Sequence, residues 1–220
     1  MSGLKYLQEQ LLSQLDALLS KKGFKRSGQD FYRNITEGRQ ILHLSFIRHP
    51  NDFDVTADVA VRHNTLEDLM NDENPRLNPR EKAQTSSIGA ELGNISIGQP
   101  IRWTVSAEDE IPQVSSSLLA SFEKVGLPYL QRFSFLDEVL SAVAGDDSAS
   151  VLHSPIDYVR AMRAIGVAFL LRRKELFHQL VASKSKYLKE KQDFGVPEFN
   201  ALAKRLSDRW DDSSGGNRQG

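Results

Sequence analysis

Apolar residues near the start of the chain recur at spacings of three and four. They are Leu4, Leu7, Leu11, Leu15 and Leu18. This spacing places them on one face of an amphipathic helix. Lys21 and Lys22 follow at the negative end of that helix, where cations are favourable, and Gly23 is a typical residue at a helix stop. The pattern predicts a helix over about residues 2–22 that packs on a core.

Residues 24–62 show strand patterns separated by turn residues. The candidate strands are residues 24–27, 30–35, 40–47 and 53–62. The turns between the last three are Thr36-Glu37-Gly38 and His49-Pro50-Asn51-Asp52. β-Branched and aromatic runs bounded by such turns indicate antiparallel hairpins. Residues 101–105 alternate in the same way and predict one more strand.

The turn at Pro50 and Asn51 predicts the register of its hairpin. With these two residues at its centre, the apolar pairs are Leu42 with Val59, Leu44 with Ala57, and Phe46 with Val55. The polar pairs are His43 with Asp58 and Ser45 with Thr56. A slip of one residue would mix the two faces, so the separation supports this register.

Most of the remaining chain has helical patterns. We expect helices over residues 64–70, from Ile111 to Gly126, from a Ser134 cap to Gly145, from Ser154-Pro155 to about residue 190, and from Pro197 onward. The helix at residue 155 is either one long helix or a pair broken near Gly166. Ser106 to Asp109 resembles a capping box. Residues 71–85, 127–130 and 146–153 are expected to be a loop, a connector and a polar linker.

These elements predict an α+β fold with an antiparallel sheet of about five strands, flanked by helices and followed by a C-terminal helical extension. We assign residues 1–145 to the α+β domain and residues 146–210 to a helical extension packed on it. Residues 211–220 are polar and glycine-rich, and we expect a disordered tail there.

Composition narrows the function classes. The chain has no cysteine, which excludes disulfides, thiolate catalysis and cysteine metal sites. The apolar run from Ile165 to Leu171 is too short to span a bilayer, so we expect a cytoplasmic protein with no membrane segment. Net charge is −1, but residues 1–154 carry a formal balance of −6 and residues 155–210 carry +6. Such a split suits steered binding to a protein partner.

The polar face of the hairpin is the first candidate site. Its residues are Tyr32, His43, Ser45, Thr56 and Asp58. His43 opposite Asp58 offers a hydrogen-bonded acid–base couple. Whether Tyr32 lies beside them depends on whether the loop at Thr36-Glu37-Gly38 holds two or three residues. The alternative is a solvated face on which the pair is only a favourable cross-strand contact.

A basic strip on the C-terminal helices is the second candidate. It comprises Arg172, Arg173, Lys174, Lys184 and Lys186, with Lys189 and Lys191 beyond them. Such a strip is able to meet phosphates or an acidic protein surface. Few aromatic residues lie among these cations, so we do not expect nucleic acid as the main partner. The alternative is a solvated helix face.

Known catalytic signatures are missing from the sequence. It has no phosphate-binding glycine loop, no G-x-S-x-G elbow and no His-x-x-x-His spacing, which are the patterns of nucleotide, serine hydrolase and zinc sites. We therefore expect no metal, no cofactor and no catalytic residues.

Several short motifs resemble a bacterial family catalogued as domain of unknown function 4304. They are Gly23-Phe24-Lys25-Arg26, Asp30-Phe31-Tyr32-Arg33, residues 53–62, Arg102-Trp103-Thr104, and Leu127-Pro128-Tyr129 before Phe133. The resemblance covers about residues 5–145 and extends more loosely to 185. It implies an α+β domain and carries no established activity.

Together these observations favour a non-enzymatic protein-interaction module, such as an immunity-type inhibitor or an adaptor in a bacterial conflict or defence system. The alternative is an enzyme or small-molecule binder that uses the polar face around His43 and Asp58. A weaker alternative is nucleic-acid binding through residues 172–191.

Overall fold

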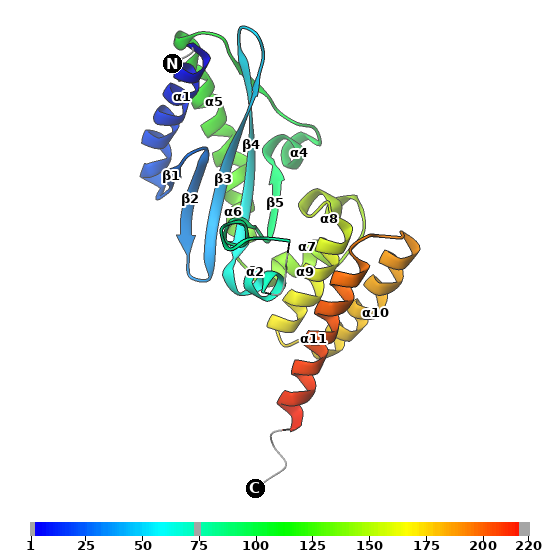
Figure 1. The fold of residues 1–220 in the computed structure, drawn as a ribbon. Coiled ribbons are helices and arrows are strands. Elements are labelled where there is room, and N and C mark those ends of the chain that lie inside the picture. Colours follow the sequence, from blue (N-terminus) through cyan, green and yellow to red (C-terminus); the bar gives the residue numbers. More distant parts are fainter. Residues whose placement is uncertain (1–2, 73–75, 216–220) are drawn as a thin grey trace. The chain divides into compact units, whose positions relative to one another are not determined.

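The computed structural model describes residues 3–72 and 76–215, and side chains up to residue 210. The chain forms two compact units (Figure 1). The first combines residues 1–63 with residues 88–134, and the second combines residues 64–87 with residues 135–220.

The first unit begins with helix α1, Gly3–Leu19, which continues as a 3₁₀ turn over Ser20–Lys22. Gly23 ends it with a φ of 83°, a left-handed conformation that favours glycine. The predicted helix and its stop are therefore confirmed. Its buried residues are Leu7, Gln8, Leu11, Leu12, Leu15 and Leu19. The buried stripe therefore differs from the predicted one: Leu4 and Leu18 are only partly buried, and Gln8, Leu12 and Leu19 are buried instead.

The sheet of the first unit is antiparallel throughout. Its strands are β1 Lys25–Ser27, β2 Asp30–Ile35, β3 Gly38–Arg48, β4 Phe53–His63, β5 Ile88–Glu91 and β6 Trp103–Val105. The order is β1-β2-β3-β4-β5, and β6 pairs with the beginning of β4. The predicted α+β fold with an antiparallel sheet is confirmed.

The β3–β4 hairpin has the predicted register. Leu42 opposes Val59, Leu44 opposes Ala57, Phe46 opposes Val55, His43 opposes Asp58, and Ser45 opposes Thr56. Leu42, Leu44 and their partners are fully buried, whereas the polar positions between them are partly exposed. The alternation therefore reflects a sheet with one covered and one open face.

Helices cover one face of this sheet. α1 packs against α5, Ile111–Ser121, and α6, Leu127–Arg132, packs against β4. The ring centroids of Phe24 and Phe122 lie 5.5 Å apart in the core beneath them. Gln40 is buried there, and its amide donates to the carbonyl of Leu130 and to the hydroxyl of Ser134. These bonds tie β3 to the end of α6.

The helix that begins at Ile111 does not stop at Gly126. It passes through one π-helical turn, Phe122–Gly126, and continues as α6, so the predicted connector at 127–130 is helical. A Cβ on Gly126 would lie 2.5 Å from Cδ2 of Phe122. Glycine is therefore required here for close packing rather than as a stop, and the wider π turn brings the Phe122 ring into the core.

Two further local predictions in this unit need correction. Strand β6 begins at Trp103, two residues later than predicted, after helix α4, Leu92–Ile97. The capping interaction before α5 is made by Glu110 rather than Asp109. Its carboxylate accepts hydrogen bonds from the backbone N–H groups of Ser106 and Ala107, because a single 3₁₀ turn over 108–110 precedes the α-helix.

The second unit is helical. Its helices are α2 Asn64–Asn71, α3 Pro79–Gln84, α7 Leu136–Val143, α8 Ser148–His153, α9 Asp157–Leu170, α10 Lys174–Glu190 and α11 Val196–Gly215. α9 is central and packs against α2, α7, α10 and α11. It is therefore buried along most of its length.

Two segments predicted to lack structure contain short helices. α3 lies within the predicted loop at 71–85, of which residues 73–75 are outside the described part, and α8 lies within the predicted linker at 146–153. Asn78 caps α3 by accepting from the N–H groups of Arg80 and Glu81. Asp147 caps α8 by accepting from the N–H of Ser150. Side-chain caps of this kind stabilise helices that are too short to form on propensity alone.

Helix boundaries also differ around α9. α9 and α10 are a pair of helices, but they break at residues 171–173, where Arg172 has a φ of 57°. Gly166 lies inside α9, and Leu66 packs closely against it, because Cδ1 of Leu66 lies only 2.9 Å from the place that a Cβ would take. Ser154 does not cap α9, because this helix begins only at Asp157. Ser134 does not cap α7 either, because the Ser134 hydroxyl donates to the Leu130 carbonyl.

The two compact units do not follow the predicted boundary at residue 145, since residues 64–87 and 135–145 belong with the C-terminal helices. α11 starts beside Pro197 as predicted. It extends to Gly215 into the segment predicted to be disordered, and the last five residues of that prediction lie outside the described part. None of the helices in the described residues is long and apolar enough to cross a membrane.

Candidate functional site

The open face of the sheet carries a row of four polar side chains. Asp30 of β2 pairs with His43 of β3, His43 pairs with Asp58 of β4, and Asp58 pairs with Glu91 of β5. Neighbouring strands lie about 4.8 Å apart, so the four positions span roughly 14 Å across the sheet. We call Asp30, His43, Asp58 and Glu91 the carboxylate row. It joins three acidic residues and one histidine.

His43 is held in a defined orientation by its neighbour on β2. Its Nδ1 lies 2.7 Å from Oδ1 of Asp30, and the two side chains are 42% and 50% exposed. An ionised carboxylate only accepts hydrogen bonds, so Nδ1 carries the proton and donates it to Asp30. Nε2 of His43 has no hydrogen-bond partner within the described residues. His43 therefore presents this nitrogen to whatever approaches the face.

Asp58 lies between His43 and Glu91 in the row, and its side chain is partly buried. Burial raises the pKa of its carboxyl group, the nearby carboxylate of Glu91 raises it further, and His43 opposes the shift. The like charge of Glu91 acts in this way because two neighbouring carboxylates disfavour ionisation of each other. A cation placed between them would relieve that repulsion.

Glu91 has a structural role in addition to its place in the row. Its carboxylate accepts from the N–H of Asn94 at 2.9 Å and from the N–H of Ile101 at 3.3 Å. It therefore caps α4 and holds the segment before β6. Because this carboxylate is fixed by the backbone, its charge is kept beside Asp58.

The structure places all five residues of the predicted face on the same side of the sheet. Ile35 pairs with Gly38, so the loop between β2 and β3 has two residues. Tyr32 then pairs with Ile41, one row away from His43. Ser45 and Thr56 pair with each other in the row on the other side. The sequence pattern did not reveal Asp30 and Glu91, because their neighbours depend on strand order.

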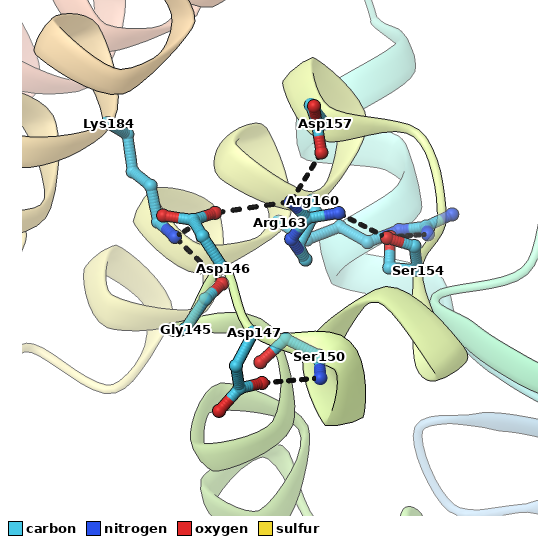
Figure 2. Close-up of polar contacts among 9 residues, drawn as sticks. All are labelled: Gly145, Asp146, Asp147, Ser150, Ser154, Asp157, Arg160, Arg163 and Lys184. Carbon is cyan, nitrogen blue, oxygen red and sulfur yellow. Dashed lines mark hydrogen bonds and ion pairs between the residues drawn. The ribbon is translucent and has the colours of Figure 1, made fainter.

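A second cluster of charges lies in the second unit, where two buried cations meet two partly exposed carboxylates (Figure 2). Arg160 of α9 is fully buried, and its Nη2 lies 2.5 Å from Oδ1 of Asp157 and 3.2 Å from Oδ1 of Asp146. Its Nη1 donates to the Ser154 carbonyl at 2.7 Å. Lys184 of α10 lies 2.8 Å from Oδ1 of the same Asp146. We call Asp146, Asp157, Arg160 and Lys184 the buried ion network.

The formal charges of the buried ion network cancel. Lys184 also donates to the carbonyl of Gly145 at 3.0 Å, and burial lowers the pKa of its ammonium group against the opposing effect of Asp146. Figure 2 shows how the network joins the 145–157 segment to α9 and α10. This arrangement pairs both buried cations with carboxylates and fixes the segment before α9, which is a structural role.

The predicted basic strip is not one continuous surface. Lys184 is buried, which corrects its assignment to an exposed strip. Arg173 pairs with Asp137, Lys186 lies 3.9 Å from Glu190, and Lys191 lies over the ring of Tyr187. Arg172 and Lys174 lie over Trp210 at 5.7 and 6.0 Å. Arg172 and Arg173 precede α10 and Lys191 follows it, the helical period distributes the remaining lysines around α10, and several of these cations contact carboxylates or rings of their own unit.

The described residues contain no group of three or more acidic or histidine side chains arranged to hold a metal ion. His63, a possible ligand in principle, is buried, and its Nε2 lies 2.8 Å from the carbonyl of Phe133. A ring nitrogen donates to such a carbonyl, so His63 belongs to the core of the first unit.

No family model matches the chain, and neither a curated protein nor a solved structure was found to be similar to it. The resemblance to the family of unknown function stays a prediction from short motifs. The functional assignment therefore rests on the geometry of the open face.

Proposed function

We propose that this chain is a protein-interaction module whose open sheet face docks a partner through a cationic side chain. The observation that carries the proposal is the carboxylate row, in which Asp30, Asp58 and Glu91 share one line of a partly exposed face. A lysine or arginine of a partner would lie between Asp58 and Glu91 and relieve their mutual repulsion, which adds to the effect of burial in raising the pKa of Asp58.

The surroundings of the row suit a protein surface as partner. Ile41 and Ala60 lie in the next row with Tyr32, and Ser45 and Thr56 lie on the other side. The charged and hydroxyl side chains fit the polar rim of a protein interface, and the Tyr32 ring is of the aromatic type that is enriched in such interfaces. A module of this kind acts as an immunity-type inhibitor when its partner is a toxin, and as an adaptor when it joins two proteins.

The experiment compares proteins captured from a lysate of the source organism by three immobilised forms of the chain. They are the wild type, the Asp30→Asn/Asp58→Asn variant, and the Asp109→Asn/Glu175→Gln variant, which removes the same charge elsewhere. Glu91 is left intact because it caps α4. A captured protein is then purified and its affinity is measured by calorimetry at two salt concentrations.

We expect one stoichiometric partner that binds the wild type and the Asp109→Asn/Glu175→Gln control equally. Its affinity for the Asp30→Asn/Asp58→Asn variant should fall at least about tenfold, and its affinity for the wild type should fall with salt. Equal binding to all three forms, or no stoichiometric partner, would contradict the proposal.

A second candidate follows from the Asp30–His43 contact of 2.7 Å. A histidine whose Nδ1 is held by a carboxylate, and whose Nε2 makes no hydrogen bond within the described residues, has the arrangement of a general base. Under this alternative His43→Gln abolishes turnover of a small-molecule substrate while partner binding persists. A metabolite-depletion assay with wild type and His43→Gln separates the two functions, since a docking module depletes nothing.

A further inference from the structure

A groove lies on the other side of β3 from His43. It is formed by the first half of α1, the turn between β1 and β2, and the last residues of β3, and its volume is about 500 Å³. Phe46, which lines it, belongs to the covered face of the sheet, whereas His43 belongs to the open face. An inference about this groove is therefore independent of the proposed docking face.

Two cations line the groove without an acidic partner. Arg26 is neutralised, because its guanidinium makes two hydrogen bonds of 2.7 Å to the carboxylate of Glu9. Lys5 and Arg48 have no ion pair within the described residues, and both are exposed. The lining thus keeps an excess of two positive charges, which favours a negatively charged occupant.

Gln8 supplies a hydrogen-bond donor that the protein does not use. Its side chain lines the groove and is only 8% exposed. Oε1 accepts from Nη2 of Arg48 at 3.1 Å, and because arginine only donates, this contact fixes which end of the amide is oxygen. Nε2 is then the other end, and it is buried with no hydrogen-bond partner in the described part of the chain. A buried unpaired donor is costly and calls for an acceptor.

The floor of the groove is apolar. Leu12 is 5% exposed, and Phe46 packs its ring 5.5 Å from that of Phe53. A fully charged ligand such as inorganic phosphate would leave this floor without a partner. A ligand that joins an anionic group to an apolar body would contact both parts of the groove.

We propose that the groove binds a small organic anion, with a carboxylate or phosphate group attached to an aromatic or aliphatic body. The anionic group lies between Lys5 and Arg48, and a turn of the Gln8 side chain brings its buried Nε2–H to that group as a donor. The apolar body covers Leu12 and Phe46. A carboxylate and a phosphate monoester share the chemistry that this site recognises, and the probes below distinguish them.

The test is an NMR titration of the full-length protein with ¹⁵N labelling. The probes are 3-phenylpropionate, phenyl phosphate, the neutral analogue 3-phenylpropionamide, and inorganic phosphate. The readout is the side-chain amide resonance of Gln8, assigned from its loss in Gln8→Leu. We expect at least one aromatic anion to shift this resonance with a Kd in the micromolar to millimolar range typical of small fragments, and the stronger anion identifies the preferred group.

Two variants test the charges. Lys5→Gln/Arg48→Gln should weaken binding at least about tenfold, whereas Lys21→Gln, an exposed lysine at the other end of the same helical segment, should leave it unchanged. Lys5 and Arg48 are exposed, so we expect the double variant to keep the thermal midpoint of the wild type, which circular dichroism checks. If that midpoint drops, the single variants Lys5→Gln and Arg48→Gln replace it.

Three results of the ligand titration would overturn the proposal. They are a Gln8 side-chain resonance that does not move with either aromatic anion, equal binding of the neutral amide, and equal binding of inorganic phosphate. Unchanged affinity in the Lys5 and Arg48 variants would overturn it as well.

Discussion

The ammonium group of Lys184 lies 2.8 Å from Oδ1 of Asp146 inside the second unit. Lys186, two residues later on α10, has a side chain that is 79% exposed. The same residue type therefore occupies opposite environments within one helical turn. Only one of these lysines is available to bind anything.

Substituting these two lysines should have very different effects on stability. Lys184→Met leaves the Gly145 carbonyl without its donor and Asp146 with only Arg160 as a partner, so we expect the free energy of unfolding to fall by about 2–3 kcal/mol. Lys186→Met should change it by less than about 0.5 kcal/mol. Urea unfolding followed by circular dichroism measures both, and similar losses in the two variants would show that the network does not stabilise the unit.

The hairpin register predicts a similar contrast between adjacent residues of β3. Leu44 is fully buried on the covered face, so Leu44→Ala should lower the free energy of unfolding by about 2–5 kcal/mol. Ser45 lies on the open face, so Ser45→Ala should change it by less than about 0.5 kcal/mol. Chemical denaturation of both variants checks this, and a larger loss at Ser45 would contradict the register.

Asp58 should make stability depend on pH in a defined direction. Burial and Glu91 raise the pKa of its carboxyl group in the folded state, so the folded state holds this proton more tightly than the unfolded state does. The free energy of unfolding should therefore fall as pH rises from about 4, the ordinary pKa of aspartate, through the raised value. Asp58→Asn should flatten this part of the profile and raise the thermal midpoint at pH 7.

The matched control for Asp58 is Asp109→Asn, which removes an exposed carboxylate from the turn before α5. Its stability profile between pH 4 and pH 7 should keep the slope of the wild type. If Asp58→Asn and Asp109→Asn give the same profile, then the environment of Asp58 is not the source of the slope.

Gly126 should not tolerate alanine, although alanine is the better helix former. An added Cβ would lie 2.5 Å from Cδ2 of Phe122 and 3.1 Å from Cγ1 of Val59, and both residues are fully buried. We expect Gly126→Ala to lower the free energy of unfolding by about 1–3 kcal/mol through overpacking. Ser116→Ala on the exposed side of α5 is the control, and a stabilised Gly126→Ala would show that the π turn relaxes freely.

The errors of sequence interpretation share one cause. Gly126 was expected to end a helix, but it makes room for Phe122. Asp109 was expected to close the capping box, but Glu110 does so because a 3₁₀ turn comes first. α8 formed in a segment expected to be a linker, with the Asp147 cap at its start. In each case the local pattern allowed more than one outcome, and packing selected between them.

The candidate sites, too, could be predicted from the sequence only where a local pattern decides which residues meet. The pattern of the hairpin placed His43 and Asp58 together, because a two-residue period and a short turn leave one register. The sequence gives only a weak indication of the role of Gln8. It is a polar residue midway between Leu4 and Leu12 on the buried side of a helix. Nothing in the pattern indicated that Arg160 and Lys184 would share Asp146.

The sequence by itself determined the α+β class, the helix α1 with its stop at Gly23, and the β3–β4 register, because each depends on periodicity and turn chemistry over a few neighbouring residues. Only the tertiary structure decided that Asp30 and Glu91 join the row, that Lys184 is buried, and that Gln8 lines a groove. These relationships depend on strand order and helix packing, which bring together residues far apart in the chain, and the energies that select them come from burial and pairing rather than from local propensity.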